Sequence, residues 1–415
     1  MSSQTGPGPD RPAIARQAIF DLDGQLYGYE LLYRGTGPVD ACDGDGMTAR
    51  VMIGALTGID LDLLSGGRPV LINATRNLLM SDLLQLLPPR RVILEILEDV
   101  EPDPELLRRL GQLAASGYRL ALDDCEDVES RRPFLDFIEI IKVDVAAVGL
   151  ATLAGQMDDW QRTGKLLLAE KVETPEEHAA LYNMGFHLFQ GFFFARPQRA
   201  APAGIPANKL VVMQLLAKVN DPAITLDDLA GVVQTDAALS LGVLRWANSP
   251  LAGLRTQIDS IERAVIVLGL ETIRNLTSLL ALARLGTTPS ELLTLLLVRA
   301  RLCELIARAS HRSSPPTFFM VGLLSGLDAV MNRPMAELLD KLPVGPEVSL
   351  ALRFRQGPIG EVLAAAERIE SGEYDRLDLD RISVDEAGGL YREAVAWTSE
   401  LNLLVPPAGT RRFAA

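Results

Sequence analysis

The stretch RLALDDCEDV, residues 119–128, places a short apolar strand directly before two adjacent carboxylates, Asp123 and Asp124. Like charges side by side repel each other, so the pair adds nothing to the stability of the strand end. A divalent cation would remove that repulsion, because hard metal ions prefer carboxylate oxygen. An acidic turn is the alternative, since aspartate is a common turn residue. What the rest of the chain brings to the same place decides between them.

Similar apolar runs recur through the first half of the chain and alternate with helical patterns. A hairpin pattern spans residues 16–33, with Asp23-Gly24 at its turn. Further strands are expected at 69–74, 91–97, 119–122, 139–145, 165–172 and 186–195, and helices at 47–64, 104–116, 150–162 and 175–184. Apolar strands alternating with helices indicate a parallel sheet covered on both faces. The sequence lacks a glycine-rich dinucleotide motif, so we expect a closed (β/α) barrel of the TIM type.

Polar side chains fall near the carboxyl ends of these strands. They are Asn73, Glu95, Asp123, Lys142, Glu170 and Gln190. Burying each one in a separate apolar strand would be costly unless they meet one another. A barrel brings such residues together at one mouth. Many oxygen ligands with a single cation would suit divalent metal ions and a phosphate ligand.

These residues belong to seven motifs that follow one another along residues 16–197. The motifs are Glu30-Leu31-Leu32-Tyr33-Arg34, Asn73, Leu94-Glu95-Ile96-Leu97-Glu98, Asp123-Asp124, Ile141-Lys142-Val143-Asp144, Ala169-Glu170-Lys171-Val172-Glu173-Thr174 and Gln190-Gly191. In this order they resemble the EAL domain, the cyclic di-GMP phosphodiesterase module of bacterial signalling. Leu31 stands where the family's name has alanine.

The resemblance implies a role for each residue. The metal ligands would be Glu30, Asn73, Glu95, Asp123 and Asp124, and they would hold one or two Mg²⁺ or Mn²⁺ ions with help from Glu170. The catalytic residues would be Lys142, Glu170 and Gln190. Arg34 would bind a ligand phosphate, and Glu98 would anchor the loop after the aspartate pair.

Three of these residues also have a plain structural interpretation. Arg34 could form a surface ion pair, and Lys142 could be a structural partner of Asp144 or Glu170. Glu98 lies in an acidic run that is typical of a solvated helix start. The motifs taken together favour the functional interpretation.

The loop after the aspartate pair departs from the family. It reads Cys125-Glu126-Asp127-Val128, whereas active members usually have Phe-Gly-x-Gly. The two glycines that permit a special loop conformation are missing. The retained ligand set favours an enzyme that cuts cyclic di-GMP to pGpG, and the altered loop favours a non-enzymatic receptor or scaffold. The segment before the next strand is also short, so one barrel helix is expected to be reduced.

The second half of the chain is helical in period throughout. We expect a flexible start at 1–15, the barrel at 16–198, a linker at 199–206, an all-α domain at 207–404 and a tail at 405–415. Residues 239–250 and 261–274 resemble the HDOD domain, which is related to metal-dependent phosphohydrolases but lacks their ligands. His311 is the only histidine of this half. The resemblance implies a regulatory role with a protein partner.

Composition limits the remaining possibilities. A net charge of -14 and 5% aromatic residues argue against nucleic-acid binding. Three scattered cysteines and three histidines suggest neither a zinc cluster nor a disulfide framework. The most apolar region, 276–300, is too interrupted to cross a membrane, and residues 1–13 do not form a signal peptide. We therefore expect a cytoplasmic protein, and the EAL resemblance makes a homodimer plausible.

Overall fold

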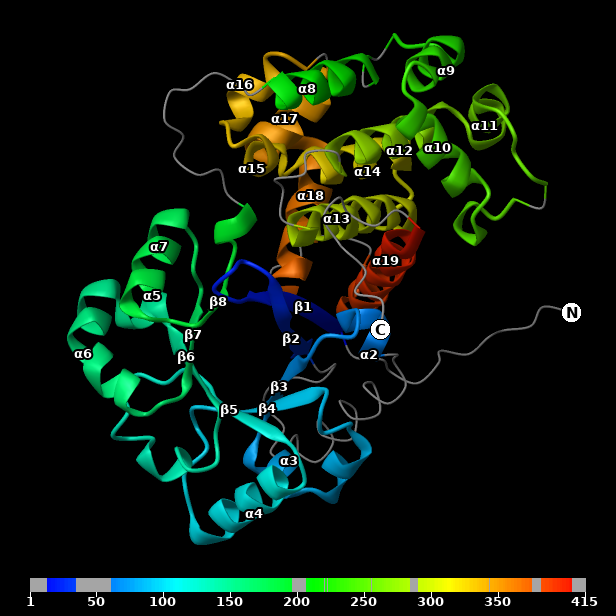
Figure 1. The fold of residues 1–415 in the computed structure, drawn as a ribbon. Helices are drawn as coiled ribbons and strands as arrows, with labels where there is room; N and C mark the ends of the chain where they lie inside the picture. Colours follow the sequence, from blue (N-terminus) through cyan, green and yellow to red (C-terminus); the bar gives the residue numbers. More distant parts are fainter. Residues whose placement is uncertain are drawn as a thin grey trace, which may run out of the picture. The chain divides into compact units, whose positions relative to one another are not determined.

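The computed structural model describes residues 13–34, 61–195, 207–219, 221, 223–254, 256–283, 290–342, 344–374 and 382–404. The chain divides into two compact units (Figure 1). The first unit comprises the chain up to Phe193 together with two later segments, residues 369–375 and 383–392. The second unit contains most of the later helices. Most of the helix predicted at 47–64 lies outside the described residues, and its end is α2 (Leu61–Ser65).

The first unit is built on a closed barrel of eight strands, which confirms the predicted architecture (Figure 1). The strands are β1 (Ala13–Phe20), β2 (Leu26–Arg34), β3 (Val70–Ala74), β4 (Val92–Ile96), β5 (Arg119–Leu122), β6 (Ile140–Asp144), β7 (Leu166–Glu170) and β8 (Leu188–Gln190). β1 runs antiparallel to both β2 and β8, and the other neighbouring strands are parallel. β1 begins slightly before residue 16, where the barrel was expected to start.

Helices alternate with these strands along the chain. They are α3 (Arg76–Met80), α4 (Pro104–Ala115), α5 (Val145–Val148), α6 (Leu150–Arg162) and α7 (Pro175–Met184). A capping box begins α7, because Thr174 Oγ1 accepts from the Glu177 amide and the Glu177 carboxylate accepts from the Thr174 amide. Between β5 and β6 the described chain forms only a three-residue 3₁₀ turn, η2 (Arg132–Phe134), which confirms the reduced helix.

Alternate side chains of each β-strand point into the barrel, and a layer of apolar ones lies beneath the site. A cluster of buried apolar side chains fills the barrel interior: Ile19, Leu71, Ile93, Ala121, Ile140, Leu168 and Leu188. Each member from β3 to β8 lies two residues before one of the six polar residues predicted to meet. Residues two apart point to the same side of a strand, so the polar side chains form a layer directly above this apolar floor.

The second unit is helical throughout its described residues, which confirms the predicted all-α class. Its helices are α8 (Ala207–Val219), α9 (Leu226–Gln234), α10 (Ala237–Ala247), α11 (Ile261–Leu268), α12 (Leu270–Ala283), α13 (Ser290–Ala309), α14 (Pro315–Leu324), α15 (Leu327–Met331), α16 (Met335–Leu339), α17 (Pro346–Phe354), α18 (Gly357–Glu370) and α19 (Val384–Leu404), the last two of which also extend into the first unit. Among the described helices, none is both long and apolar enough to span a membrane.

Candidate active site

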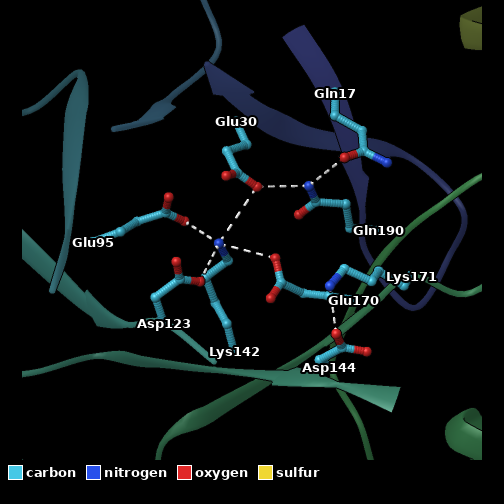
Figure 2. Close-up of polar contacts among 9 residues, drawn as sticks. All are labelled: Gln17, Glu30, Glu95, Asp123, Lys142, Asp144, Glu170, Lys171 and Gln190. Carbon is cyan, nitrogen blue, oxygen red and sulfur yellow. Dashed lines mark hydrogen bonds and ion pairs between the residues drawn. The ribbon is translucent and has the colours of Figure 1, made fainter. Parts of the chain in front are cut away.

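Lys142 lies at the centre of the polar layer, surrounded by carboxylates from four other strands or strand ends (Figure 2). Its Nζ is 2.7 Å from Asp123 Oδ1, 2.9 Å from Glu95 Oε1, 2.9 Å from Glu170 Oε1 and 3.4 Å from Glu30 Oε2. Only 1% of the lysine side chain is exposed. Asp144 is not one of its partners, because that carboxylate pairs with Lys171 instead.

Gln190 fixes the position of Glu30 on the opposite side of this cluster. Its Nε2 donates to Glu30 Oε2 at 2.7 Å and to Gln17 Oε1 at 2.9 Å (Figure 2). Gln17 lies opposite Glu30 in the β1–β2 ladder. The amide therefore holds one carboxylate of the cluster in a defined orientation.

Burial and mutual repulsion perturb the acids of the cluster. Burial, and then the negative charge of Glu30, raise the pKa of Glu95 well above its usual range. Burial also raises the pKa of Glu170, although Lys142 opposes the shift. Burial alone would lower the pKa of Lys142, but the surrounding carboxylates outweigh it and raise that pKa. The lysine therefore stays charged, but its single positive charge is too little to keep all the surrounding acids ionised.

The donor set fits divalent cations. Four buried carboxylates (Glu30, Glu95, Asp123 and Glu170) surround one ammonium, so full ionisation would leave an excess of three negative charges that divalent cations would reduce. Carboxylate oxygens of Asp123, Asp124 and Glu170 lie within 4.8 Å of one another. Among the described side chains, the buried oxygens Asn73 Oδ1 and Glu95 Oε2 accept no hydrogen bond. Such unpaired oxygens are available as ligands.

The structure thus brings together most of the residues that the sequence singled out. Asn73 lies beside Glu95 in the β3–β4 ladder, and Asp124 follows Asp123 with a left-handed backbone, φ 40°. β2 ends at Arg34, whose side chain lies outside the described part of the chain. Glu98 is exposed, and it meets the loop through its backbone carbonyl, which accepts from Arg131.

Sequence reasoning gave no role at this mouth to Gln17, and it did not predict that Lys171 pairs with Asp144. Gln17 accepts a hydrogen bond from Gln190, and Lys171 pairs with Asp144 (Figure 2). Gln17 could have been found from alternation, because it is an inward-facing polar position two residues before Ile19 in the first strand. Lys171 and Asp144 stand in two of the quoted motifs, but nothing in the sequence indicates that they pair with each other.

The strand β8 ends at Gln190, whereas the sequence predicted a strand up to residue 195. Gly191 is the residue that follows β8. Its φ is 144°, and a Cβ atom there would lie 2.1 Å from the Val172 carbonyl oxygen and 2.5 Å from the Val172 nitrogen. The close approach lets Val172 N donate to Gln190 O at 3.0 Å. Only glycine fits this backbone conformation and this spacing.

We expect Gly191→Ala to lower the free energy of unfolding by about 2–4 kcal/mol, because the new methyl group forces two backbone segments apart. Urea denaturation measures the change. Gly155→Ala is the matched control, since Gly155 lies in α6 with open space around it and should gain up to about 1 kcal/mol. Equal denaturation midpoints for Gly191→Ala and the unmodified protein would contradict the prediction.

The first unit is thus a closed barrel with an antiparallel first strand and an acidic layer at the carboxyl ends of its strands. The family model of the EAL domain matches residues 55–197, and that of the HDOD domain matches residues 205–340. The Bacillus subtilis (strain 168) protein YuxH, described as uncharacterized, is 30% identical over 404 residues, covering 94% of this chain and 99% of YuxH. The chain therefore belongs to the family of proteins that join an EAL domain to an HDOD domain.

Two further similarities have a named ligand or activity. Cyclic di-GMP phosphodiesterase CdgJ of Vibrio cholerae is 29% identical over 406 residues, which is 94% of this chain and 93% of CdgJ. The manganese and cyclic di-GMP complex of Klebsiella pneumoniae BlrP1 at pH 9.0 is 26% identical with a TM-score of 0.39, and the match covers 46% of this chain and 57% of that one.

Proposed function

We propose that the barrel binds cyclic di-GMP and hydrolyses one of its phosphodiester bonds to give linear pGpG, using one or two Mg²⁺ or Mn²⁺ ions. The observation that carries the proposal is the layer of four buried carboxylates around Lys142, with the less buried Asp124 beside Asp123 and Glu170. Such a layer is costly to bury without added positive charge. The named activity of CdgJ, a relative along nearly the whole chain, supports the choice of substrate.

The residues of the layer would have different roles in metal binding and catalysis. Glu30, Asn73, Glu95 and Asp123 would hold the metal, and Asp124 and Glu170 would complete a second position. Bound divalent ions supply two things, a more acidic water and positive charge beside the scissile phosphate. Lys142 keeps its proton and would stabilise the negative charge that develops on the phosphate oxygens. Gln190 orients Glu30, and Arg34 would bind a phosphate of the ligand.

The enzyme is favoured over a receptor or scaffold because the altered loop still delivers Asp124 to the mouth of the barrel. Oxygens of this residue and of Asp123 and Glu170 come within 4.8 Å of one another without the family's glycines. We further propose a cytoplasmic, homodimeric protein whose HDOD domain carries the signal to a protein partner.

Incubation of the purified protein with cyclic di-GMP and either Mg²⁺ or Mn²⁺ tests the proposal. We expect pGpG to form, and we expect neither Glu30→Gln nor an EDTA-treated sample to produce it. Calorimetry with Ca²⁺ would measure binding without turnover. Tight binding of cyclic di-GMP with no pGpG at high protein concentration would establish the receptor instead.

A further inference from the structure

The loop that follows β5 holds Asp124 in a strained conformation. A left-handed backbone costs a residue with a side chain roughly 1–2 kcal/mol, and it persists only where the surroundings enforce it. On the near side, the Asp123 amide donates to Ile96 O at 2.9 Å and the Cys125 amide donates to Lys142 O at 3.0 Å. Cys125 itself is buried, and burial raises the pKa of its thiol to about 12. This end of the loop is therefore fixed by backbone contacts with β4 and β6.

At the far end of the loop, Val128 packs against the apolar core of the barrel and Arg131 makes hydrogen bonds to the turn after β4. Its Nη1 donates to Val100 O at 3.1 Å, and its Nη2 donates to Glu98 O. The guanidinium also lies 5.9 Å from the centre of the Phe134 ring, which is fully buried. Both acceptors belong to the turn after β4, the strand that carries Glu95. Arg131 thus connects the loop that carries Asp124 to the turn that follows the strand of Glu95.

The tie lies next to the mouth of the barrel. A cavity of about 430 Å³ has Arg131, Glu98, Asp124 and Asp144 in its wall. Inside the loop, the remaining bonds are local: the Ser130 amide donates to Asp127 Oδ1 at 2.8 Å, and Cys125 Sγ donates to Asp127 O at 3.3 Å. Local bonds keep the loop compact, but the bonds of Arg131 are those that connect its far end to the turn after β4.

We propose that Arg131 is a positioning residue for the metal site. It holds Asp124 in place in a loop that lacks the family's glycines. The inference rests on the proposed function, since it concerns the same metal ions. A planar guanidinium donates in two directions at once and can bridge two carbonyls, whereas a lysine ammonium on a flexible stem is a poorer bridge. Loss of a residue that orients a ligand typically weakens metal binding by about 10- to 100-fold.

Calorimetric titration of the full-length, metal-free protein with Mn²⁺ tests the proposal without any reaction. We expect Arg131→Ala to weaken Mn²⁺ binding at least about tenfold and Arg131→Lys to weaken it less. Hydrogen exchange of the amides in residues 123–131 should be faster in Arg131→Ala. Arg132→Ala is the matched control, because Arg132 is exposed and pairs with Glu129 in the same turn, and it should bind Mn²⁺ normally.

An Mn²⁺ affinity of Arg131→Ala within twofold of the unmodified protein would overturn the proposal. If Arg131→Ala does not fold, Arg131→Lys decides, and an affinity within twofold of the unmodified protein overturns it equally. An unmodified protein that binds Mn²⁺ but forms no pGpG contradicts the proposed reaction while leaving the comparison at Arg131 valid. An unmodified protein that binds no Mn²⁺ contradicts both.

Discussion

Replacing Lys142 with methionine is expected to lower the turnover number for cyclic di-GMP by about 100- to 1000-fold. Methionine keeps the length of the side chain but removes the one ammonium that the structure places within 3.4 Å of four carboxylates. Charge that develops on the phosphate in the transition state would lose its fixed counter-charge. The rate of pGpG formation at saturating Mn²⁺ and cyclic di-GMP measures the effect.

The same substitution should also change the stability of the metal-free protein. Removing one partner from a buried ion pair typically costs about 3–5 kcal/mol, because the remaining charges stay buried. In EDTA the variant should therefore melt well below the unmodified protein, and Mn²⁺ should recover part of the loss by supplying positive charge. This response to Mn²⁺ distinguishes an electrostatic defect from general misfolding.

Lys165→Met is the control for Lys142→Met. Lys165 directly precedes β7, so it lies at the amino end of the barrel strands, opposite the site. Its loss should leave both the turnover number and the effect of Mn²⁺ on melting unchanged. Lys142→Met with a turnover number within threefold of the unmodified protein would show that the lysine is only a structural partner of the acids.

Alternation along the strands explains why so much of this site could be predicted from the sequence. The apolar runs identify the barrel strands, and the period of two residues fixes which side chain of each strand faces inward. Glu95 comes two residues after Ile93, and Glu170 comes two residues after Leu168, so each acid faces inward like the apolar residue before it. An inward-facing polar residue above an apolar one can be recognised in a single sequence.

Contacts between loops could not be predicted in the same way. Arg131 reaches Val100 across 31 positions of the chain, and neither residue lies in a strand or in a periodic pattern. The exposed position of Glu98 and the early end of β8 at Gly191 depend likewise on which backbone segments meet in space. Periodicity specifies the face of an element, whereas the packing of irregular segments depends on the assembled fold.

Glu95→Gln is expected to have opposite effects on metal binding and on stability. Burial, followed by the charge of Glu30, already raises the pKa of Glu95, so the folded, metal-free protein favours the neutral acid. Glutamine mimics that neutral form, and Lys142 keeps three other carboxylate partners. In EDTA we therefore expect the variant to be at least as stable as the unmodified protein, with a gain of about 1 kcal/mol or more near neutral pH.

The sign of the pH dependence follows from the same shift. An acid whose pKa is higher in the folded state destabilises the fold increasingly as the pH rises above the ordinary glutamate value of about 4.3. Glutamine cannot ionise, so the advantage of Glu95→Gln over the unmodified protein in EDTA should widen from pH 5 to pH 8. Urea denaturation at each pH measures this difference.

Metal binding should change in the other direction, because the amide of Glu95→Gln has no negative charge to offer a cation. We expect Mn²⁺ to bind at least about tenfold more weakly by calorimetry, and the melting temperature to rise less on its addition. Glu105→Gln, at a side chain that is 62% exposed on α4, should alter neither quantity. Metal-free Glu95→Gln that is less stable than the unmodified protein would mean that Glu95 serves as a structural partner of Lys142. The opposite result would mean that the barrel keeps a destabilising charge in its interior because the metal ion requires it.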